Sequence, residues 1–582
     1  QKRLPREQLA LHQVQDFLIR LQWQYVFRGS QMVTSTIKTK GLTCQPPPSS
    51  MVPPELCVWS NMFTRTVENC LKRARARFRN QRWLGANTLP LEVAALKWMQ
   101  NSEFVPLPTD KDGGYCLVEK HFVQEAQNGI LRKSWYQQNF EDLAVLYKNA
   151  CSSYRTLAWN IAEKLQTDAL YSQICRSLRG CTNKDLPRKL SLTVKTHKPP
   201  GDISFRNLHV GGPQPFGGLS AWLNNQLDGV LHRLPHLLMS SKDLFQRIKD
   251  LQFNHPVSLA RIDLKEFFMS GKDTDFLRCV DLLPVSIRPE AAAAIDFLCK
   301  HQFLVADAVP GTLWKVQTGT GMGLIHSSQL CDLTYYRHAE HGLVTANALD
   351  VLGICLYLRF RDDILVVYNT EKNQFSRFVN LLKSKAPYVQ LHCESISNVK
   401  AVMLDLQISV VQDRVKGRWF FDIGPYFKPS SLQVPLSCSS FHNPSVHVSW
   451  PFNQLRRLAS LCSNETRFQE AKNVFVKRFI DAKEPFCLVS ALQKFNPWPI
   501  NKDGKVIRHR NASQNKWLVL PYHPVWQKSG LKSEIMKFVN SDLARRLWGT
   551  LFASDPPEVG IAWKNGSPCA KFIFCDTAKI SG

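Results

Sequence analysis

The sequence predicts a mixed α+β fold, in which short buried strands end in acidic residues and amphipathic helices pack around them. The first observation is an apolar run at 257–262 that leads directly into Asp263. The second is a pair of apolar runs at 354–358 and 364–367. They enclose Asp362 and Asp363, which predicts a β-hairpin with the acidic pair at its turn. The third is the helical spacing of apolar residues near the N-terminus and again beyond residue 460.

These three acidic residues are candidate metal ligands. Adjacent carboxylates at a buried turn repel each other unless cations neutralise them. Asp263, Asp362 and Asp363 at the ends of neighbouring strands would suit two Mg²⁺ ions, with Mn²⁺ as a substitute, because both ions prefer oxygen ligands. Two such ions clamp the attacking and leaving oxygens of phosphoryl transfer, which is polymerase chemistry. A structural hairpin with a solvated turn is the alternative.

The composition excludes several classes of protein. The apolar content is that of a globular chain, and no apolar run approaches the ~20 residues that span a bilayer, so no membrane is expected. The seventeen cysteines include no Cys-x-x-Cys pair, which disfavours zinc. The net charge of +27 favours a polyanionic partner, although many basic proteins bind membranes or nothing specific. The chain begins with Gln1, as a fragment would.

The N-terminal region combines a predicted helix with a basic cluster. Leu11, Val14, Leu18 and Leu21 recur at helical spacing, and Gly29 is placed to end the helix. The basic cluster spans 72–83 and lies beside aromatic residues. Its arginines are candidates for nucleic-acid contact, with a solvated face as the alternative: Arg73, Arg75, Arg77 and Arg79.

Two further segments contribute candidate ligand-binding residues. The strand predicted at 192–195 runs into a basic turn, and its cations would meet a triphosphate or a template backbone if they are not plain surface: Lys195, His197, Lys198 and Arg206. A glycine-rich turn at 317–324 includes Gln317, Gly321 and Gly323, and glycines let a backbone approach a ligand closely. Farther on, an apolar stripe predicts a helix capped by Asn464: Phe468, Ala471, Val474, Phe475 and Ile480.

In order along the chain, these motifs resemble those of reverse transcriptases, and more narrowly those of Penelope-like retroelements. The resemblance extends from about 104 to 574, and its segments are 109–114, 195–199 with Arg206, 263–268, 319–323, 360–363, 403–406, 426–429 and 442–444. It implies that Asp263 and Asp362 are the main Mg²⁺ ligands, with Asp363 beside them. It also implies that Phe268 excludes the ribose 2′-hydroxyl, that Gln317, Gly321 and Gly323 pack on the nucleotide and template, and that Lys195 and Arg206 face the triphosphate or template.

The sequence departs from the family pattern at the acidic turn and at the glycine-rich turn. Phe360 replaces the usual Tyr, and Arg361 replaces a small or apolar residue, so that Arg361 is expected either to pair with the acidic residues or to touch the template. Residues 324–327 also differ from the family pattern, and the spacing of Gln317 is one residue short. No GIY-YIG nuclease motif is visible, which agrees with a truncated chain or with the endonuclease-lacking branch, and a nuclease acting in trans is then possible.

The resemblance implies a right-hand polymerase with five segments. These are a basic helical N-terminal region (1–100), fingers (101–256), a palm (257–412), a helical thumb (413–500) and a C-terminal extension of the thumb (501–582). The implied activity is RNA-directed DNA synthesis in the nucleus from an RNA template, a DNA primer and dNTPs. An RNA-dependent RNA polymerase and an inactive RNA-binding derivative are the alternatives.

Overall fold

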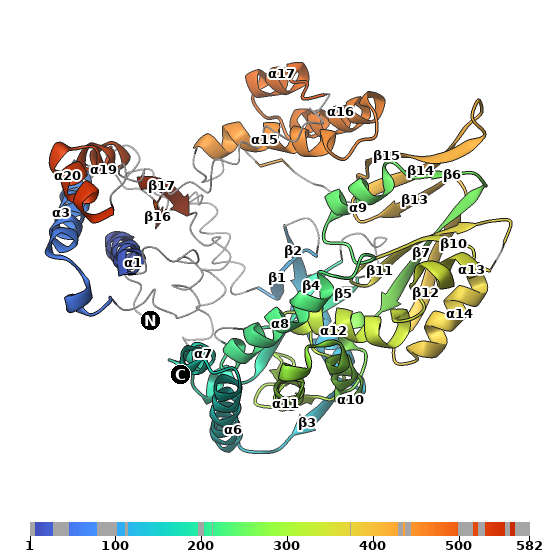
Figure 1. Ribbon diagram of the computed structural model, residues 1–582, viewed down its shortest axis with the longest axis horizontal. Coiled ribbons are helices and arrows are strands. Elements are labelled where there is room, and N and C mark those ends of the chain that lie inside the picture. Colours follow the sequence, from blue (N-terminus) through green and yellow to red (C-terminus); the bar gives the residue numbers. More distant parts are fainter. Residues whose placement is uncertain are drawn as a thin grey trace. The chain divides into compact units, whose positions relative to one another are not determined.

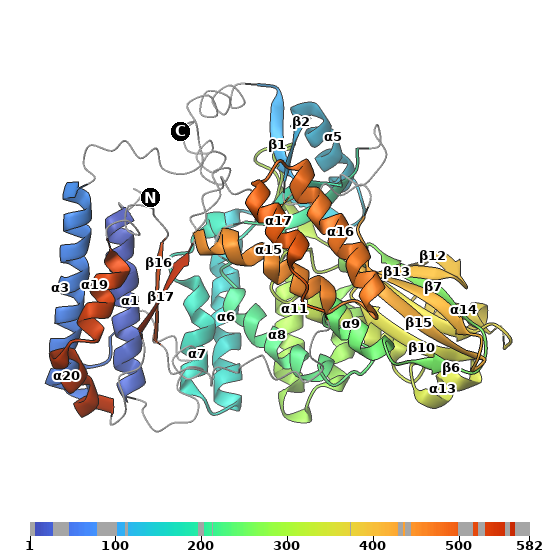
Figure 2. The same ribbon diagram turned by 90° about the horizontal axis from the view of Figure 1, so that it is seen from above.

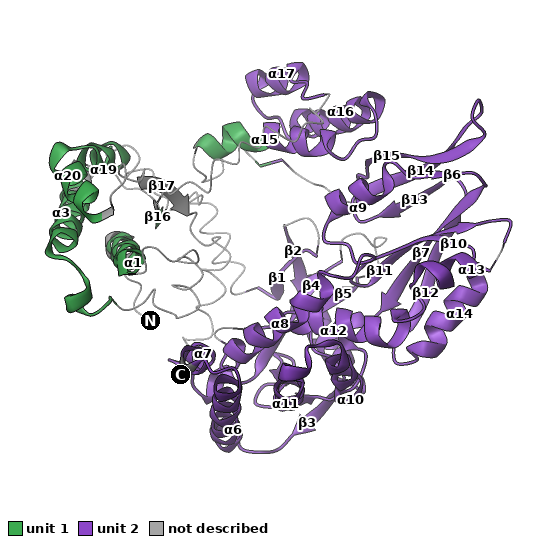
Figure 3. Ribbon diagram, viewed as in Figure 1, with its two compact units in different colours: residues 1–101, 436–451, 501–582 green, residues 102–435, 452–500 purple. Residues whose placement is uncertain are grey.

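The structure is a computed structural model, and its described residues fall into two compact units (Figure 3). Unit 1 comprises residues 1–101, 436–451 and 501–582, and unit 2 comprises 102–435 and 452–500. The structure describes residues 6–26, 46–77, 102–110, 114–195, 203–211, 214–372, 374–428, 435–436, 444–498, 516–521, 530–552 and 559–564. Gly29, Arg79, His197 and Lys198 therefore lie outside the described residues.

Unit 2 is built on an antiparallel sheet, which we call the central sheet (Figure 1). Its order is β10 (Ile354–Phe360), β11 (Asp363–Asn369), β7 (Val257–Lys265) and β12 (Gln390–Ser397). Phe360 pairs with Asp363, so the hairpin turn consists of Arg361 and Asp362 alone. The predicted hairpin is confirmed, with Asp362 in its turn and Asp363 as the first residue of β11.

Alternating residues of β7 separate the two faces of the central sheet. Ala260, Ile262 and Leu264 are buried in the largest core, together with residues of α8 (Gly217–Leu231), α11 (Arg288–Lys300), α12 (Ser327–Tyr335) and α14 (Phe375–Lys385). On the opposite face Val257 and Leu259 are buried in a second core. Later residues on that face are charged and half-buried: Arg261, Asp263 and Lys265. The second core therefore covers only the first part of this face of β7, and the part that carries the charged residues is partly open to solvent.

A second antiparallel sheet forms that second core. Its order is β13 (Lys400–Met403), β14 (Leu406–Asp413), β15 (Arg418–Pro425) and β6 (Gln252–Phe253). The hairpin between β14 and β15 pairs Asp413 with Arg418, so the boundary expected after residue 412 would divide it. Three helices follow this sheet: α15 (Pro444–Ala459), α16 (Glu465–Asp481) and α17 (Phe486–Lys494).

A five-stranded sheet combines segments from both sides of the boundary expected at 256/257. Its order is β3 (Tyr136–Asn139), β9 (Leu313–Val316), β8 (Phe303–Val305), β4 (Arg188–Val194) and β5 (Phe205–Val210). The sequence does not reveal this pairing, because β8 and β9 lie about a hundred residues after β4 and β5. The other elements of this part are β1 (Phe104–Pro108), β2 (Tyr115–Glu119), α5 (Lys120–Leu131), α6 (Leu143–Lys164), α7 (Asp168–Cys175), α9 (Ser241–Ile248), α10 (Asp273–Leu277) and α13 (Ala346–Val351).

Unit 1 joins the two ends of the chain. Helices α1 (Arg6–Val26) and α3 (Pro54–Arg77) share a core with β16 (Lys516–Pro521), α19 (Leu531–Val539) and α20 (Asp542–Phe552), and β17 (Val559–Lys564) pairs with β16 in parallel (Figure 2). Trp59 packs edge-on against Trp548, with ring centroids 5.2 Å apart. The segment expected to extend the thumb therefore packs on the N-terminal helices, because its apolar face matches theirs.

The helical stripes are confirmed in part. In α16 the side chains of Phe468, Ala471 and Phe475 are buried, whereas Val474 and Ile480 are exposed. The side chain of Asn464 caps α16, as predicted, by accepting from the backbone N–H of Arg467 at 3.0 Å. None of the described helices combines the length and the apolar character that crossing a bilayer requires.

Candidate active site

The three predicted carboxylates meet at one corner of the central sheet. Asp263 and Asp363 occupy directly opposed positions on adjacent strands, so their side chains share a face. These side chains are 18% and 24% exposed. The carbonyl of Asp362 accepts a hydrogen bond from the backbone N–H of Leu264 at 2.9 Å, which fastens the turn to β7. Solvent therefore reaches the corner only in part.

The corner concentrates negative charge around Asp362. Burial, and after it the charge of Asp363, raises the pKa of Asp362 from 3.8 to about 6. Asp263 adds to this effect, whereas Arg206 of β5 opposes it. A buried carboxylate whose pKa is raised by two like charges is an environment that a cation would stabilise.

Two basic residues of β7 already contact the acidic residues. The guanidinium Nη2 of Arg261 lies 2.9 Å from Asp363 Oδ1, and Lys265 Nζ lies 2.5 Å from Asp263 Oδ2. In the part of the chain that the structure describes, no three His, Cys, Asp or Glu side chains are arranged to hold a metal ion. The donor set nevertheless fits divalent cations by its chemistry, because such ions prefer carboxylate oxygens. To bind an ion, Asp363 and Asp263 would have to exchange their contacts with Arg261 and Lys265 for contacts with the metal.

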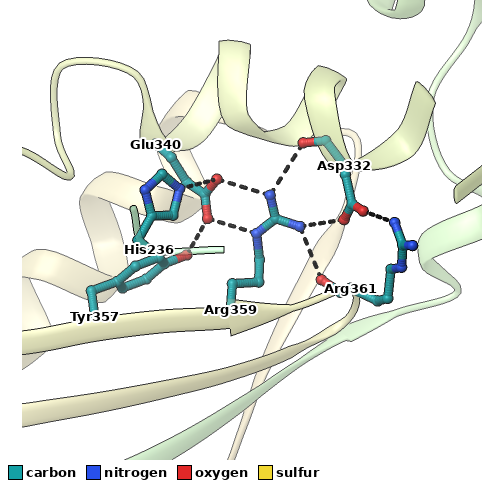
Figure 4. A network of polar contacts seen from close by, with 6 residues as sticks. All are labelled: His236, Asp332, Glu340, Tyr357, Arg359 and Arg361. Carbon is teal, nitrogen blue, oxygen red and sulfur yellow. Dashed lines mark hydrogen bonds and ion pairs between the residues drawn. The ribbon is translucent and has the colours of Figure 1, made fainter. Parts of the chain in front are cut away.

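The acidic turn has a strained backbone and is braced by a buried polar network (Figure 4). Arg361 has φ 56°, a left-handed conformation that is uncommon for residues other than glycine. Its carbonyl accepts from Nη1 of Arg359 at 3.1 Å, and its guanidinium pairs with Asp332. The turn residue next to Asp362 is therefore held through both its backbone and its side chain.

Arg359 is the centre of this network and is completely buried. Its guanidinium donates to both carboxylate oxygens of Glu340, at 2.7 and 2.9 Å, and to Asp332 Oδ1 at 2.6 Å. Burial alone would raise the pKa of Glu340, but Arg359 above all holds it well below its ordinary range. Two further side chains complete the contacts to Glu340: Tyr357 at 2.6 Å and His236 at 3.1 Å.

The glycine-rich turn packs against the segment that follows Asp263. The backbone N–H of Thr320 donates to the carbonyl of Phe268 at 2.8 Å, and a Cβ added to Gly319 would lie 2.4 Å from that same oxygen. Gly321 has φ 58°, and a Cβ there would lie 1.9 Å from the ring of His209. Only glycine fits these two approaches. Gly323 has φ 114°, and the backbone N–H of Gln317 donates to the carbonyl of Trp135 at 2.7 Å.

Phe268 lies between two buried neighbours but is itself only half-buried. Phe267 and Met269 are 5% and 4% exposed. The ring of Phe268 packs edge-on against Phe267, with centroids 5.6 Å apart. Phe267 is a buried member of the largest core, and Phe268 packs against that core while part of its ring stays accessible to a ligand.

The cations expected near the triphosphate lie on β5 and at the end of β4. Arg206 pairs with the buried carboxylate of Asp110 at 3.1 Å while remaining 37% exposed, and its charge acts on Asp362. Lys195 follows directly after β4 and is half-buried. The charge of Arg206 thus acts on the acidic corner, and Lys195 directly follows the strand paired with that of Arg206, where its backbone N–H donates to the carbonyl of Ser204 at 2.9 Å.

The basic cluster of unit 1 is described in part. Lys72 and Arg73 are exposed on α3, and Arg73 pairs with Glu534 of α19 at 2.9 Å. Arg75 and Arg77 belong to the last turn of α3, and their side chains lie outside the part of the chain that the structure describes. Because Arg73 has a partner within unit 1, its expected contact with nucleic acid competes with that ion pair.

Sequence reasoning missed most partners of the charged residues. Glu394 contacts both Arg261 and Lys265, and Asp332 and Glu340 neutralise Arg359. The available signal was Arg359 itself, because an arginine within an apolar strand needs a buried carboxylate.

No protein-family model matches the chain, and no curated protein matches it by sequence. Among solved structures, telomerase from Candida albicans, in a complex with a telomeric RNA fragment, is similar at 11% identity and TM-score 0.44, covering 95% of this chain and 97% of the telomerase. Apo telomerase from Candida tropicalis, truncated from its C-terminal domain, is similar at 11% identity and TM-score 0.36, covering 64% and 79%. The RNA-dependent RNA polymerase of a human picobirnavirus is similar at 11% identity and TM-score 0.34, covering 74% and 87%.

The chain has a mixed α and β fold. Its central sheet presents carboxylates on a partly open face, with helices on the other. Similarities at these TM-scores add no weight to a functional argument, which depends on the acidic corner itself. Membership of the Penelope-like family stays a prediction.

The raised pKa of Asp362 predicts that the metal-free protein loses stability as the pH rises. The folded state keeps this proton up to about pH 6, whereas the unfolded chain releases it near the ordinary value of 3.8. The unfolding free energy therefore falls between about pH 4 and 6, by at most ~3 kcal/mol. Denaturant titrations in EDTA at pH 4.5 and 7 should show a larger loss for wild type than for Asp362→Asn. Equal losses would contradict this assignment.

Proposed function

We propose that the protein is an RNA-directed DNA polymerase that extends a DNA 3′ end on an RNA template. The observation that supports this most is that Asp263 and Asp363 lie opposite each other on adjacent strands at a partly open sheet corner, with Asp362 in the adjoining turn. When bound there, two Mg²⁺ ions would activate the primer 3′-hydroxyl and stabilise the charge that develops on the α-phosphate of the dNTP. Asp263 and Asp362 would hold these ions, and Asp363 would assist them.

The surrounding residues fit the other parts of this reaction. Arg206 places a positive charge near the acidic corner, where a triphosphate would need one. The backbone of the glycine-rich turn is fixed against Phe268, so a nucleotide beside Phe268 would also lie near this turn. We further propose that the protein works in the nucleus as part of a Penelope-like retroelement, with any nuclease supplied in trans.

Two alternatives remain to be compared with this proposal. An RNA-dependent RNA polymerase would use the same acidic corner, and sugar preference separates the two enzymes. The unusual Arg361 and the altered glycine-rich turn are the observations that favour an inactive RNA-binding derivative. The pairing of Arg361 with Asp332, away from the acidic pair, weakens that alternative. Primer extension with RNA template, DNA primer and either dNTPs or NTPs tests all three, and incorporation of dNTPs is expected.

Phe268→Ala is expected to relax the choice of sugar. The half-buried ring offers a 2′-hydroxyl no hydrogen-bond partner, and leaving that group unpaired costs on the order of 1–3 kcal/mol. The relative kcat/KM for ribonucleotides should therefore rise about tenfold or more. Phe268→Tyr retains the ring and should keep the preference for dNTPs. Unchanged preference in a folded Phe268→Ala protein would remove Phe268 from the nucleotide site.

A further inference from the structure

The charged residues on the open face of the central sheet form a continuous chain of alternating charge. Asp363 contacts Arg261 at 2.9 Å, and Arg261 Nε lies 3.3 Å from Glu394 Oε2. Glu394 Oε1 lies 3.8 Å from Lys265 Nζ, which in turn contacts Asp263 at 2.5 Å. Glu394 thus connects the two basic residues that occupy the acidic corner.

Metal binding at this corner requires both basic residues to leave their present partners. A divalent ion on Asp263 or Asp363 repels the adjacent Lys265 or Arg261, which compete for the same oxygens. Both belong to β7, two residues to either side of Asp263, so neither leaves this face of the sheet. Each therefore needs another anionic partner nearby.

Glu394 is placed to be that partner. It lies on β12, which pairs with the edge of β7 opposite to β11. It therefore contacts Arg261 and Lys265 from the side of β7 that faces away from the acidic turn. The pairing between β12 and β7 shifts register between Cys393 and Ser395, which leaves Glu394 as an extra residue. Such bulges re-aim a side chain. The carboxylate is 32% exposed, and it already contacts both cations.

We propose that Glu394 is a positioning residue, which takes over Arg261 and Lys265 when divalent ions bind Asp263 and Asp363. The inference rests on the proposed function, because it requires the acidic corner to be the metal site. Glu394 lowers the cost of freeing the carboxylates and in this way sets the metal affinity, without touching metal or nucleotide. Removal of its charge leaves both cations with Asp263 and Asp363 as their only partners in this chain of charges.

Mn²⁺ binding, followed by electron paramagnetic resonance on the full chain without nucleic acid, tests this directly. Glu394→Gln is expected to raise the Mn²⁺ Kd by about tenfold, the lower end of what outer partners of metal ligands contribute. Glu371→Gln removes the same charge beyond the far end of β11 and should leave the Kd unchanged. A weaker Mn²⁺ affinity in both variants, or in neither of them, overturns the proposal. Thermal melts confirm that each variant folds.

A double-mutant cycle separates an effect of Glu394 through Arg261 and Lys265 from a direct electrostatic effect of its charge on the bound metal. In the Arg261→Met, Lys265→Met background the carboxylates are already free, so adding Glu394→Gln should no longer raise the Kd. A tenfold rise that persists there would mean that Glu394 acts on the metal itself, which overturns the inference and leaves the metal site intact. If wild type and Asp263→Asn bind Mn²⁺ equally weakly, the corner is no metal site, and both proposals fail.

Discussion

Asp263→Asn and Asp362→Asn are each expected to abolish primer extension while RNA binding remains. Each substitution removes one carboxylate of the acidic corner and keeps the size of the side chain. The charge stabilisation that a bound metal supplies to the transition state is then lost, which for comparable electrostatic groups lowers the rate about 10²-fold or more. Binding of an RNA template would depend on contacts of cationic side chains with phosphates, which the loss of a negative charge does not weaken. Single-turnover extension and filter binding with the same RNA measure the two effects separately.

Asp350→Asn is the matched control for these variants. Asp350 lies on α13 and forms an exposed ion pair with Lys372, so its loss should leave extension unchanged. Extension at the wild-type rate by Asp362→Asn would remove the acidic corner from the reaction. A parallel loss of RNA binding and of stability would instead assign Asp362 a structural role.

The strands and the turn that carry the acidic residues were predictable because their signals are local. The apolar runs on both sides of Asp362 and Asp363 fix two strands and the turn between them, and the run before Asp263 fixes a third strand. The period of two in β7 then decides which residues share a face with Asp263. The adjacency of β7 and β11, which brings Asp263 opposite Asp363, is a distant pairing, and it was expected from the resemblance of the motifs and not from these local signals.

Features that depend on distant pairing were not predictable. The five-stranded sheet joins β4 to β8, and unit 1 joins residues 1–101 to 501–582, and neither association can be seen in a list of continuous segments. The partners of Arg359 come from other elements for the same reason. Its burial demands carboxylates, but the sequence offers many, and only the fold selects Asp332 and Glu340.

Glu340→Gln is expected to cause a large loss of stability. Its carboxylate lies with Arg359 in a site where both side chains are completely buried, and removing one partner leaves the other charge uncompensated. Breaking such a pair costs about 3–5 kcal/mol, against ~1 kcal/mol or less for an exposed pair. Chemical denaturation should therefore show a much lower midpoint for Glu340→Gln than for Lys372→Met, which breaks the exposed pair with Asp350.

A double variant separates the contribution of the Arg359–Glu340 ion pair to stability from the support that the network gives to the acidic turn. Arg359→Met with Glu340→Leu removes both charges and should recover most of the lost stability, because apolar side chains can replace a buried pair. It should not recover full extension activity, since the carbonyl of Arg361 would still lack its donor and the left-handed turn beside Asp362 would be free to relax. Recovery of both stability and activity would show that the network contributes only to folding. A Glu340→Gln protein as stable as wild type would mean that Arg359 is neutralised by Asp332 alone.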